Sequence, residues 1–291
     1  DLINVKGGVK LNKGNLVLNN LKLYTPNPAP VRFLNILFKK SLIKDGLFTS
    51  DLVLNGPVDD FITTGNINFS NVIVPMYESV IDDIKIVLNN KEGIADFKLF
   101  SFNTNADVKL NFENKLSLPV VINNVSVHSD SISIDNLMKA FSSLASTSNR
   151  NNSSIGINSM QNTMLTPSDI HVKKGSIAAD KVLINNIEGE NLKLDFSHST
   201  DTSLKIDNAS INIAGGSIKG NGSYKFDTGD VFVSSDIIDC DANELTKAFF
   251  NVDGQIYGSA NGNVKLSIND FSSADYVKKI NADVDFEIIK G

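Results

Sequence analysis

The residues of this chain that could do chemistry are few and lie far apart in the sequence. The 291 residues include three histidines, His128, His171 and His198, and one cysteine, Cys240. Zinc sites bring such residues together at short, recognisable spacings, and no such spacing occurs here. We therefore expect the histidines to lie on the surface or at strand edges. Cys240 is expected to pack as a small hydrophobic side chain.

Two acidic pairs, Asp59-Asp60 and Asp82-Asp83, are the other candidate metal ligands. Neither stands in an EF-hand or a glycine-aspartate repeat, and we expect both at turns, where Asp caps backbone N–H groups. A glycine-rich phosphate loop and a G-x-S-x-G nucleophile turn are also missing from the sequence. With no convergent set of titratable residues, the sequence predicts no catalytic residue, no metal, no cofactor and no enzyme.

Charge and composition narrow the choice of partners. The net charge is −6, and the lysines are scattered in pairs such as Lys39-Lys40 rather than clustered. Nucleic-acid binding requires a basic cluster, so no nucleic acid is expected as a partner. The chain starts at Asp1 and stops at Gly291 directly after a strand pattern. We interpret it as an excised part of a longer protein.

Alternation of apolar and polar residues dominates the sequence and indicates which elements it forms. Leu192, Leu194 and Phe196 are separated by polar residues, and the same pattern recurs in Val264–Ile268 and Val284–Ile288. Because side chains alternate between the two faces of a strand, each segment predicts a strand with one apolar face. Asn pairs and Gly separate such segments and favour turns. The fold class is therefore mainly β, a long antiparallel meander with a few short helices.

The expected helices and one biased segment suggest how the chain is divided. Short helices are predicted near Leu34, Leu137 and Leu245, the last two opening at Asp135 and Asp241. The phrase Leu137-Met-Lys-Ala-Phe141 returns 108 positions later as Leu245-Thr-Lys-Ala-Phe249, which suggests an internal repeat. Residues 142–168 are rich in Ser, Asn and Thr, a composition typical of a loop or linker. The predicted domains are 1–141, the linker 142–168, and 169–291.

The apolar faces of the predicted strands must be buried by something, and the few short helices cannot bury all of them. The faces could pack on a second sheet as a sandwich, close into a barrel, or line an open groove covered by a ligand. The residues alone leave these alternatives open.

The segment from Ile170 to Gly291 resembles the AsmA-like family of bacterial envelope proteins, which includes the TamB-type proteins. The resemblance rests on the order of its parts: the glycine-containing strand HVKKGSIAADKVLI, the glycine pair in ASINIAGGSIKG, the helix DANELTKAFF, the spaced glycines of VDGQIYGSANGNVKLSI, and the last strand VKKINADVDFEIIKG. The segment around Asn55–Val58 and Thr64–Phe69 is similar to the TamB-type strand turn. The Ser/Asn-rich segment departs from the family pattern.

The resemblance implies a curved, elongated β-groove that binds phospholipid and conducts acyl chains between the inner and outer membranes. It also implies a periplasmic protein, anchored to the inner membrane by a segment outside this sequence, with a role in outer-membrane biogenesis. The expected groove-lining residues are Leu192, Leu194, Phe196, Leu204, Ile206, Ile211, Ile213, Val264, Leu266, Ile268, Val284, Phe286 and Ile288. The alternative is a structural or adhesive β-protein that supports envelope assembly without carrying lipid.

Overall fold

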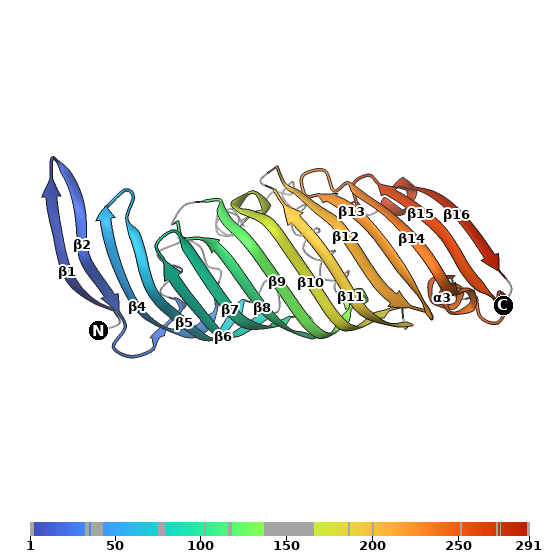
Figure 1. Ribbon diagram of the computed structural model, residues 1–291, viewed down its shortest axis with the longest axis horizontal. Coiled ribbons are helices and arrows are strands. Elements are labelled where there is room, and N and C mark those ends of the chain that lie inside the picture. Colours follow the sequence, from blue (N-terminus) through green and yellow to red (C-terminus); the bar gives the residue numbers. More distant parts are fainter. Residues whose placement is uncertain are drawn as a thin grey trace, which may run out of the picture. The chain divides into compact units, whose positions relative to one another are not determined.

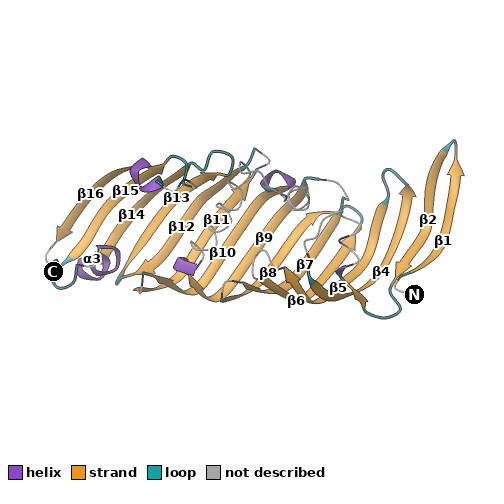
Figure 2. Ribbon diagram, turned by 180° about the vertical axis from the view of Figure 1, so that it is seen from behind, coloured by secondary structure: helices purple, strands orange, loops and turns teal. Residues whose placement is uncertain are grey.

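In a computed structural model the chain is mainly β, as the alternation predicts. The structure describes residues 3–32, 35, 43–74, 79–101, 103–115, 118–136, 166–185, 187–199, 201–250, 252–271, 273 and 275–289. Hydrogen bonding links the strands in the order β1-β2-β4-β5-β6-β7-β8-β9-β10-β11-β12-β13-β14-β15-β16, with β3 paired to β4. The predicted meander is therefore confirmed (Figures 1 and 2).

The described residues form two compact units, and the division falls within β9. Unit 1 takes in the chain as far as Val125 except Phe102–Thr104, and unit 2 takes in the remainder of β9 from Ser126 and the strands from His171 in β10 to β16. The elements of unit 1 are β1 (Asn4–Asn12), β2 (Asn15–Tyr24), β3 (Ala29–Pro30), β4 (Asp45–Pro57), β5 (Ile62–Val74), β6 (Ser79–Asn89), β7 (Glu92–Ser101) and β8 (Thr104–Glu113), followed by β9 (Val120–Ser133).

Unit 2 continues with strands of similar length and carries a helix. Its elements are β10 (Ile170–Ile184, preceded by the 3-10 turn η4 at Pro167–Asp169), β11 (Ile187–His198), β12 (Ser203–Ile213), β13 (Gly216–Lys225), β14 (Val231–Asp241), α3 (Ala242–Phe250), β15 (Ser259–Ile268), the 3-10 turn η5 (Tyr276–Lys279) and β16 (Ile280–Ile289). From β10 to β16 each strand pairs antiparallel with the next one along the chain.

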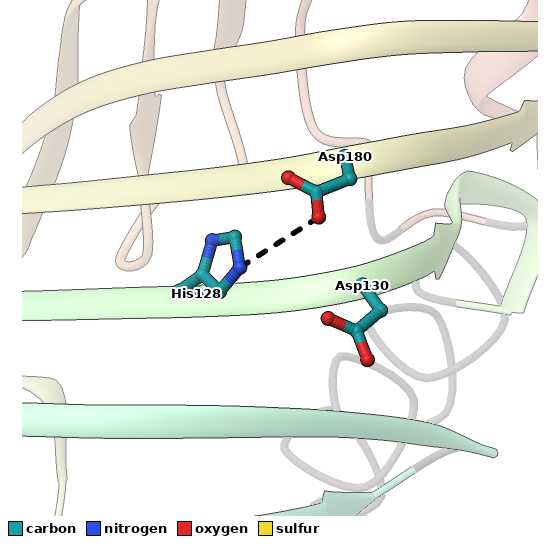
Figure 3. A group of neighbouring side chains, drawn as sticks. All are labelled: His128, Asp130 and Asp180. Atoms are coloured by element: carbon teal, nitrogen blue, oxygen red, sulfur yellow. Dashed lines mark ion pairs between the residues drawn. The ribbon is translucent and has the colours of Figure 1, made fainter.

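One step of the meander departs from the antiparallel prediction, because β9 and β10 run in the same direction. The residues that directly follow the two strands meet: the backbone N–H of Asn185 donates to the Asp135 carboxylate, 3.2 Å from Oδ2. The arrows of the two strands also point the same way in Figure 3. Parallel strands need a long return connection, and the chain between Ser133 and Ile170 provides one.

The helix predicted near Leu245 is present as α3, and Asp241 caps it. The Asp241 Oδ1 accepts the backbone N–H of Glu244 at 2.9 Å, which satisfies one of the free donors of the first turn. Ala242 and Leu245 are buried on one side of this helix. Between β15 and β16 the described helical structure is the 3-10 turn η5.

The second helical phrase occupies a matching position, but its cap differs from the prediction. Residues 134–136 are helical directly after β9, as α3 is directly after β14, and the two starts lie 108 positions apart. Ser133 Oγ accepts the Asn136 N–H at 3.3 Å, whereas Asp135 was expected as the cap and instead binds Asn185. The rest of this phrase, most of the segment around Leu34, and residues 142–165 of the expected linker lie outside the described residues.

Each unit has its own hydrophobic core. In unit 1 the core is Ala29, Val31, Phe48 and Val72, with Ile67, Phe69 and Ile84 packed against it. In unit 2 it gathers where α3 meets the strand ends, and contains Ile132, Ala179, Val182, Ile211, Ile213, Ala214, Cys240, Ala242, Leu245 and Ala260. Both cores are small for the number of strands, so much of the apolar surface is left only partly covered.

Candidate functional site

Strand register brings every predicted lining residue of unit 2 onto one face, which we call the apolar face. Residues directly opposite each other in an antiparallel pair point to the same side of the sheet. One unbroken set of opposed residues crosses the unit from β10 to β16, and we call it the central row: Ile177, Leu194, Ala209, Gly220, Ser235, Val264 and Val284. The other predicted residues lie in the rows on either side of it.

A bulge in β12 keeps predicted residues on this face where simple alternation would fail: the register shifts between Ile206 and Ala209, so Ile206 and Ile211 share the face although they are an odd number of positions apart. Similar bulges occur in β11 and β14. In β11 the register shifts between Glu190 and Lys193, where Asn191 has φ 57°. In β14 it shifts between Ile237 and Cys240, where Asp239 has φ 53°. Asn and Asp tolerate the left-handed conformation better than other non-glycine residues. Each bulge adds a second consecutive exposed residue, and the apolar series resumes one position later.

Exposure across the apolar face is uneven. Ile211, Ile213 and Ile268 are buried, whereas Leu192, Leu194, Phe196, Leu204, Ile206, Val264 and Leu266 are half-buried. On β16 Val284 is 56% exposed, and Phe286 and Ile288 are also exposed. No residue of the central row is buried. The row is therefore apolar surface that the described part of the chain covers only in part.

The two ends of the apolar face are covered by different groups. At one end α3 packs Ala242 and Leu245 against Ile213, Cys240 and Ala260. Figures 1 and 2 show α3 at that end of β14 and β15. At the other end rings gather: Phe226 lies 4.8 Å from Tyr224 and 5.5 Å from His198, centroid to centroid. The central row lies between these two covered ends.

Small residues on this face are required by the backbone of the neighbouring strand. A Cβ on Gly220 would lie 2.5 Å from the backbone oxygen of Ser234. At Gly175 and Gly262 the space above the glycine is filled by a ring from the opposite strand, Phe196 and Phe286 respectively. Gly220 has no such ring over it, so the middle of the central row carries little side-chain bulk.

Sequence reasoning missed the contributions of β10, β13 and β14 to this face. Ile177, Ile218 and Val233 lie on it, opposite Leu194, Ile211 and Leu266 respectively. In β13 the alternation could have been recognised, because Ile218 and Tyr224 are an even number of positions apart and polar residues, Lys and Ser among them, lie between. The glycines in that strand hide the alternation. In β14 two adjacent apolar residues, Phe232 and Val233, point to opposite faces.

Cys240 lies in the core, as expected from its apolar surroundings. It is fully buried, with Sγ 3.5 Å from the carbonyl oxygen of Ile213. Burial raises the pKa of the Cys240 thiol, which keeps it in the unreactive protonated form. A role as a nucleophile is not supported by this environment.

The histidines fall in different settings, and one of them departs from the prediction. His198 is buried rather than exposed, and its Nδ1 lies 2.8 Å from the Ser203 carbonyl oxygen. His128 is exposed but has carboxylate neighbours: its Nε2 lies 3.9 Å from Asp180 Oδ2, and Asp130 is close by (Figure 3). The ligand atoms of these three residues lie within 4.8 Å of one another. The sequence could not show this proximity, because Asp180 is on a different strand.

The cluster of His128, Asp130 and Asp180 supplies three groups of the types that bind divalent cations. All three are exposed on the polar side of β9 and β10. An exposed pair of this kind is weak in water, and a protonated His128 would form an ion pair with Asp180. Among the described residues no fourth ligand joins them within this distance. We describe the group as a polar surface cluster.

The acidic pairs also fall in two different settings. Asp60 lies in a turn, where its N–H donates to the Pro57 carbonyl at 3.0 Å. Asp82 and Asp83 are inside β6, not at a turn as expected. The Asp82 Oδ1 accepts the backbone N–H of Asn71 at 3.0 Å, and this hydrogen bond lowers the pKa of the Asp82 carboxyl. The pair therefore stabilises a bulge.

A hollow of about 560 Å³ lies beside Phe232 and is lined mostly by polar residues. Lys205 and Asp207 form an ion pair at its wall. The hollow is open to solvent, and none of the residues that line it belongs to the central row.

No described helix is long and apolar enough to cross a membrane. Comparisons of the chain with protein-family models, with curated proteins and with solved structures gave no match.

Proposed function

We propose that this chain is part of an AsmA-like periplasmic protein whose apolar face binds phospholipid acyl chains and conducts them between the inner and outer membranes. The observation that carries the proposal is the central row, an apolar path across β10 to β16 in which no residue is buried. Apolar surface of this extent is rare on proteins that bind nothing. The family, the periplasmic location and the anchor outside this sequence belong to the same proposal.

The dimensions of the row suit an acyl chain. Neighbouring strands are about 4.8 Å apart, so the six steps from β10 to β16 span about 29 Å. A bilayer has a hydrocarbon core about 30 Å thick, and one leaflet therefore accounts for about 15 Å. The row is long enough for one extended chain with room to move along it. Each methylene removed from water would contribute about 0.8 kcal/mol.

The chemistry of the row also fits a carrier rather than an enzyme. Its members are apolar or small, and Ser235 carries the one hydroxyl group among them. Burial of methylenes needs no fixed hydrogen-bond geometry, so lipids with different head groups would be accepted. The head group can stay in water because the row is open to solvent.

A photo-crosslinking amino acid at Leu194 tests the proposal directly. The chain is incubated with vesicles of phosphatidylethanolamine and phosphatidylglycerol and then analysed by mass spectrometry for lipid adducts. Lys193 is the matched control, because it is adjacent in β11 and exposed on the other face. We expect adducts at position 194 and few at position 193. A folded protein that forms none at 194, or equal amounts at both positions, would favour the structural β-protein.

A further inference from the structure

The polar surface cluster of His128, Asp130 and Asp180 lies where two strands run in the same direction. His128 and Asp130 are two positions apart in β9, so their side chains point to the same face of the sheet. Asp180 is in β10, the neighbouring strand, and follows Ala179, which lies opposite Leu192 on the apolar face. Figure 3 shows the three side chains beside these two strands. The cluster therefore belongs to the face that turns away from the central row.

The donor atoms of the cluster converge without bonding to one another. All three lie within 4.8 Å of one another, and His128 Nε2 is 3.9 Å from Asp180 Oδ2, which is beyond hydrogen-bond distance. Two ligand atoms that bind one zinc ion, each about 2.0–2.1 Å from it, are about 3.4 Å apart at the tetrahedral angle. Small rotations of exposed side chains would close the difference. The spacing is therefore close to that of atoms that share one ion.

The two carboxylates of the cluster have no basic side chain to balance them. Among the residues that the structure describes, neither Asp130 nor Asp180 forms an ion pair with a lysine or an arginine. The ionic neighbour of Asp180 is His128. Two carboxylates this close together repel each other when both are ionised. A divalent cation would balance both negative charges and take a nitrogen ligand from His128.

We propose that His128, Asp130 and Asp180 bind one Zn²⁺ ion, with water in the remaining coordination positions. An imidazole with two carboxylates is a mixed nitrogen and oxygen set, which suits zinc better than Mg²⁺ or Ca²⁺, since those ions prefer oxygen alone. The His128 and Asp180 side chains are 49% and 67% exposed, so water can reach the ion. Because parallel pairing is slightly less stable than antiparallel pairing, an ion that bridges β9 and β10 would reinforce a weaker step of the sheet. The proposal does not depend on lipid binding.

The test uses the whole chain, stripped of metal with a chelator and titrated with zinc sulfate by calorimetry. We expect saturable binding of one ion per chain, and a melting temperature that is higher with zinc than without it. His128→Ala, Asp130→Asn and Asp180→Asn should each weaken zinc binding at least about tenfold, because each removes one ligand. All three residues are exposed, so the metal-free variants should melt at the temperature of the metal-free wild type.

Two matched variants control for zinc bound elsewhere on the surface. His171→Ala and Asp195→Asn change residues of the same types in β10 and β11, outside the cluster. Both should bind zinc as the wild type does. Hydrogen exchange should become slower with zinc in β9 and β10 near the ligands, and it should not change in β14 and β15.

The outcomes also distinguish zinc from cations that bind oxygen alone. Mg²⁺ in about hundredfold excess should leave zinc bound, because it gains little from an imidazole ligand. Displacement of zinc by Mg²⁺ would overturn the role of His128. Zinc binding that survives the loss of any one of the three ligands, slower exchange outside β9 and β10, or no binding of zinc at all would overturn the proposal.

Discussion

At the scale of single residues, the apolar face holds two kinds of site that look alike in the sequence. Leu194 and Ile213 both belong to alternating segments, yet Leu194 is half-buried and Ile213 is 2% exposed. The difference is that Ile213 belongs to the core that contains Ala242 and Leu245 of α3, whereas Leu194 does not. An introduced charge should therefore mainly impair lipid binding at Leu194 and mainly lower stability at Ile213.

With the photo-crosslinking residue moved to Val264 in the same row, Leu194→Asp should abolish lipid crosslinking and lower the free energy of unfolding by about 1 kcal/mol, because the carboxylate stays in contact with water. Ile213→Asp should lower it by about 4 kcal/mol or more, because a charge would be buried without a partner. Urea denaturation and crosslinking of the same two proteins measure both effects. If Leu194→Asp were to unfold the protein as Ile213→Asp does, the central row would be packed core and the proposed function would fail.

Cys240 gives a second prediction at this scale. Since burial raises the pKa of its thiol, little thiolate should be present at pH 8 and labelling by a thiol reagent should be slow in the folded protein and fast in urea. A thiol pKa that is higher in the folded than in the unfolded protein stabilises the folded state at pH values below the ordinary thiol pKa, near 8.5. This stabilisation should be lost as the pH rises through the raised pKa of the folded protein. Labelling rates and urea midpoints between pH 7 and pH 10 check both statements, and equal rates in native and unfolded protein would contradict them.

At the scale of elements, bulges decide which residues share a face. Asn20 in β2, Asn71 in β5, Asp83 in β6, Asn191 in β11 and Asp239 in β14 all have positive φ within a strand. The N–H groups of some are capped by a neighbouring side chain, as when Asp239 N–H donates to Asn261 Oδ1 at 3.0 Å. Without these bulges the residues on either side of each would point to opposite faces.

Asn191→Val should destabilise the chain by about 1–2 kcal/mol, because a β-branched residue is strained at φ 57°. Asn191→Gly should be close to neutral, since glycine adopts this conformation freely. Asn212→Val is a suitable control, because Asn212 is exposed on the neighbouring strand and is not among the positive-φ residues. Urea unfolding provides the measurement. Equal effects of Val at positions 191 and 212 would show that the bulge conformation carries no energetic cost.

Local alternation specifies strands and their apolar faces, but it does not specify bulges or strand pairing. Strands with clean alternation, such as the one around Val264, Leu266 and Ile268, could be predicted together with their apolar face. The bulges could not, because Asn and Asp are equally common in turns, and Asp82-Asp83 was placed in a turn for that reason. The direction of β10 and the approach of Asp180 to His128 depend on which strands pair, and no local pattern carries that information.

At the scale of the whole molecule, the meander makes each strand depend mainly on its two neighbours. In both units the extensive contacts join strands that are adjacent in the sheet. Chains built in this way behave as one-dimensional arrays, in which a perturbation fades within a few units. Stability is therefore expected to be local, with end strands opening more readily than inner ones.

Removal of β16, by ending the chain at Lys279, should raise amide exchange in β15 and change little in β10 to β12. Hydrogen exchange measured by mass spectrometry on the shortened and full chains gives the comparison. The reason is that β15 would lose one of its two ladders, while the inner strands would keep both. A loss of protection throughout unit 2 would mean that its strands fold as a single cooperative block, contrary to this expectation.

The parallel pairing of β9 and β10 has a consequence for where the helical phrases lie. Five neighbour steps separate β9 from β14, and five reversals would send the two strands in opposite directions. Because one step is parallel, only four reversals remain, and β9 and β14 end at the same margin of the sheet. The helical turns that follow them therefore lie along the same margin, and Ile132 and Leu245 belong to one core. The one parallel step thus places the ends of β9 and β14, and the helical turns that follow them, on the same side of the sheet in unit 2.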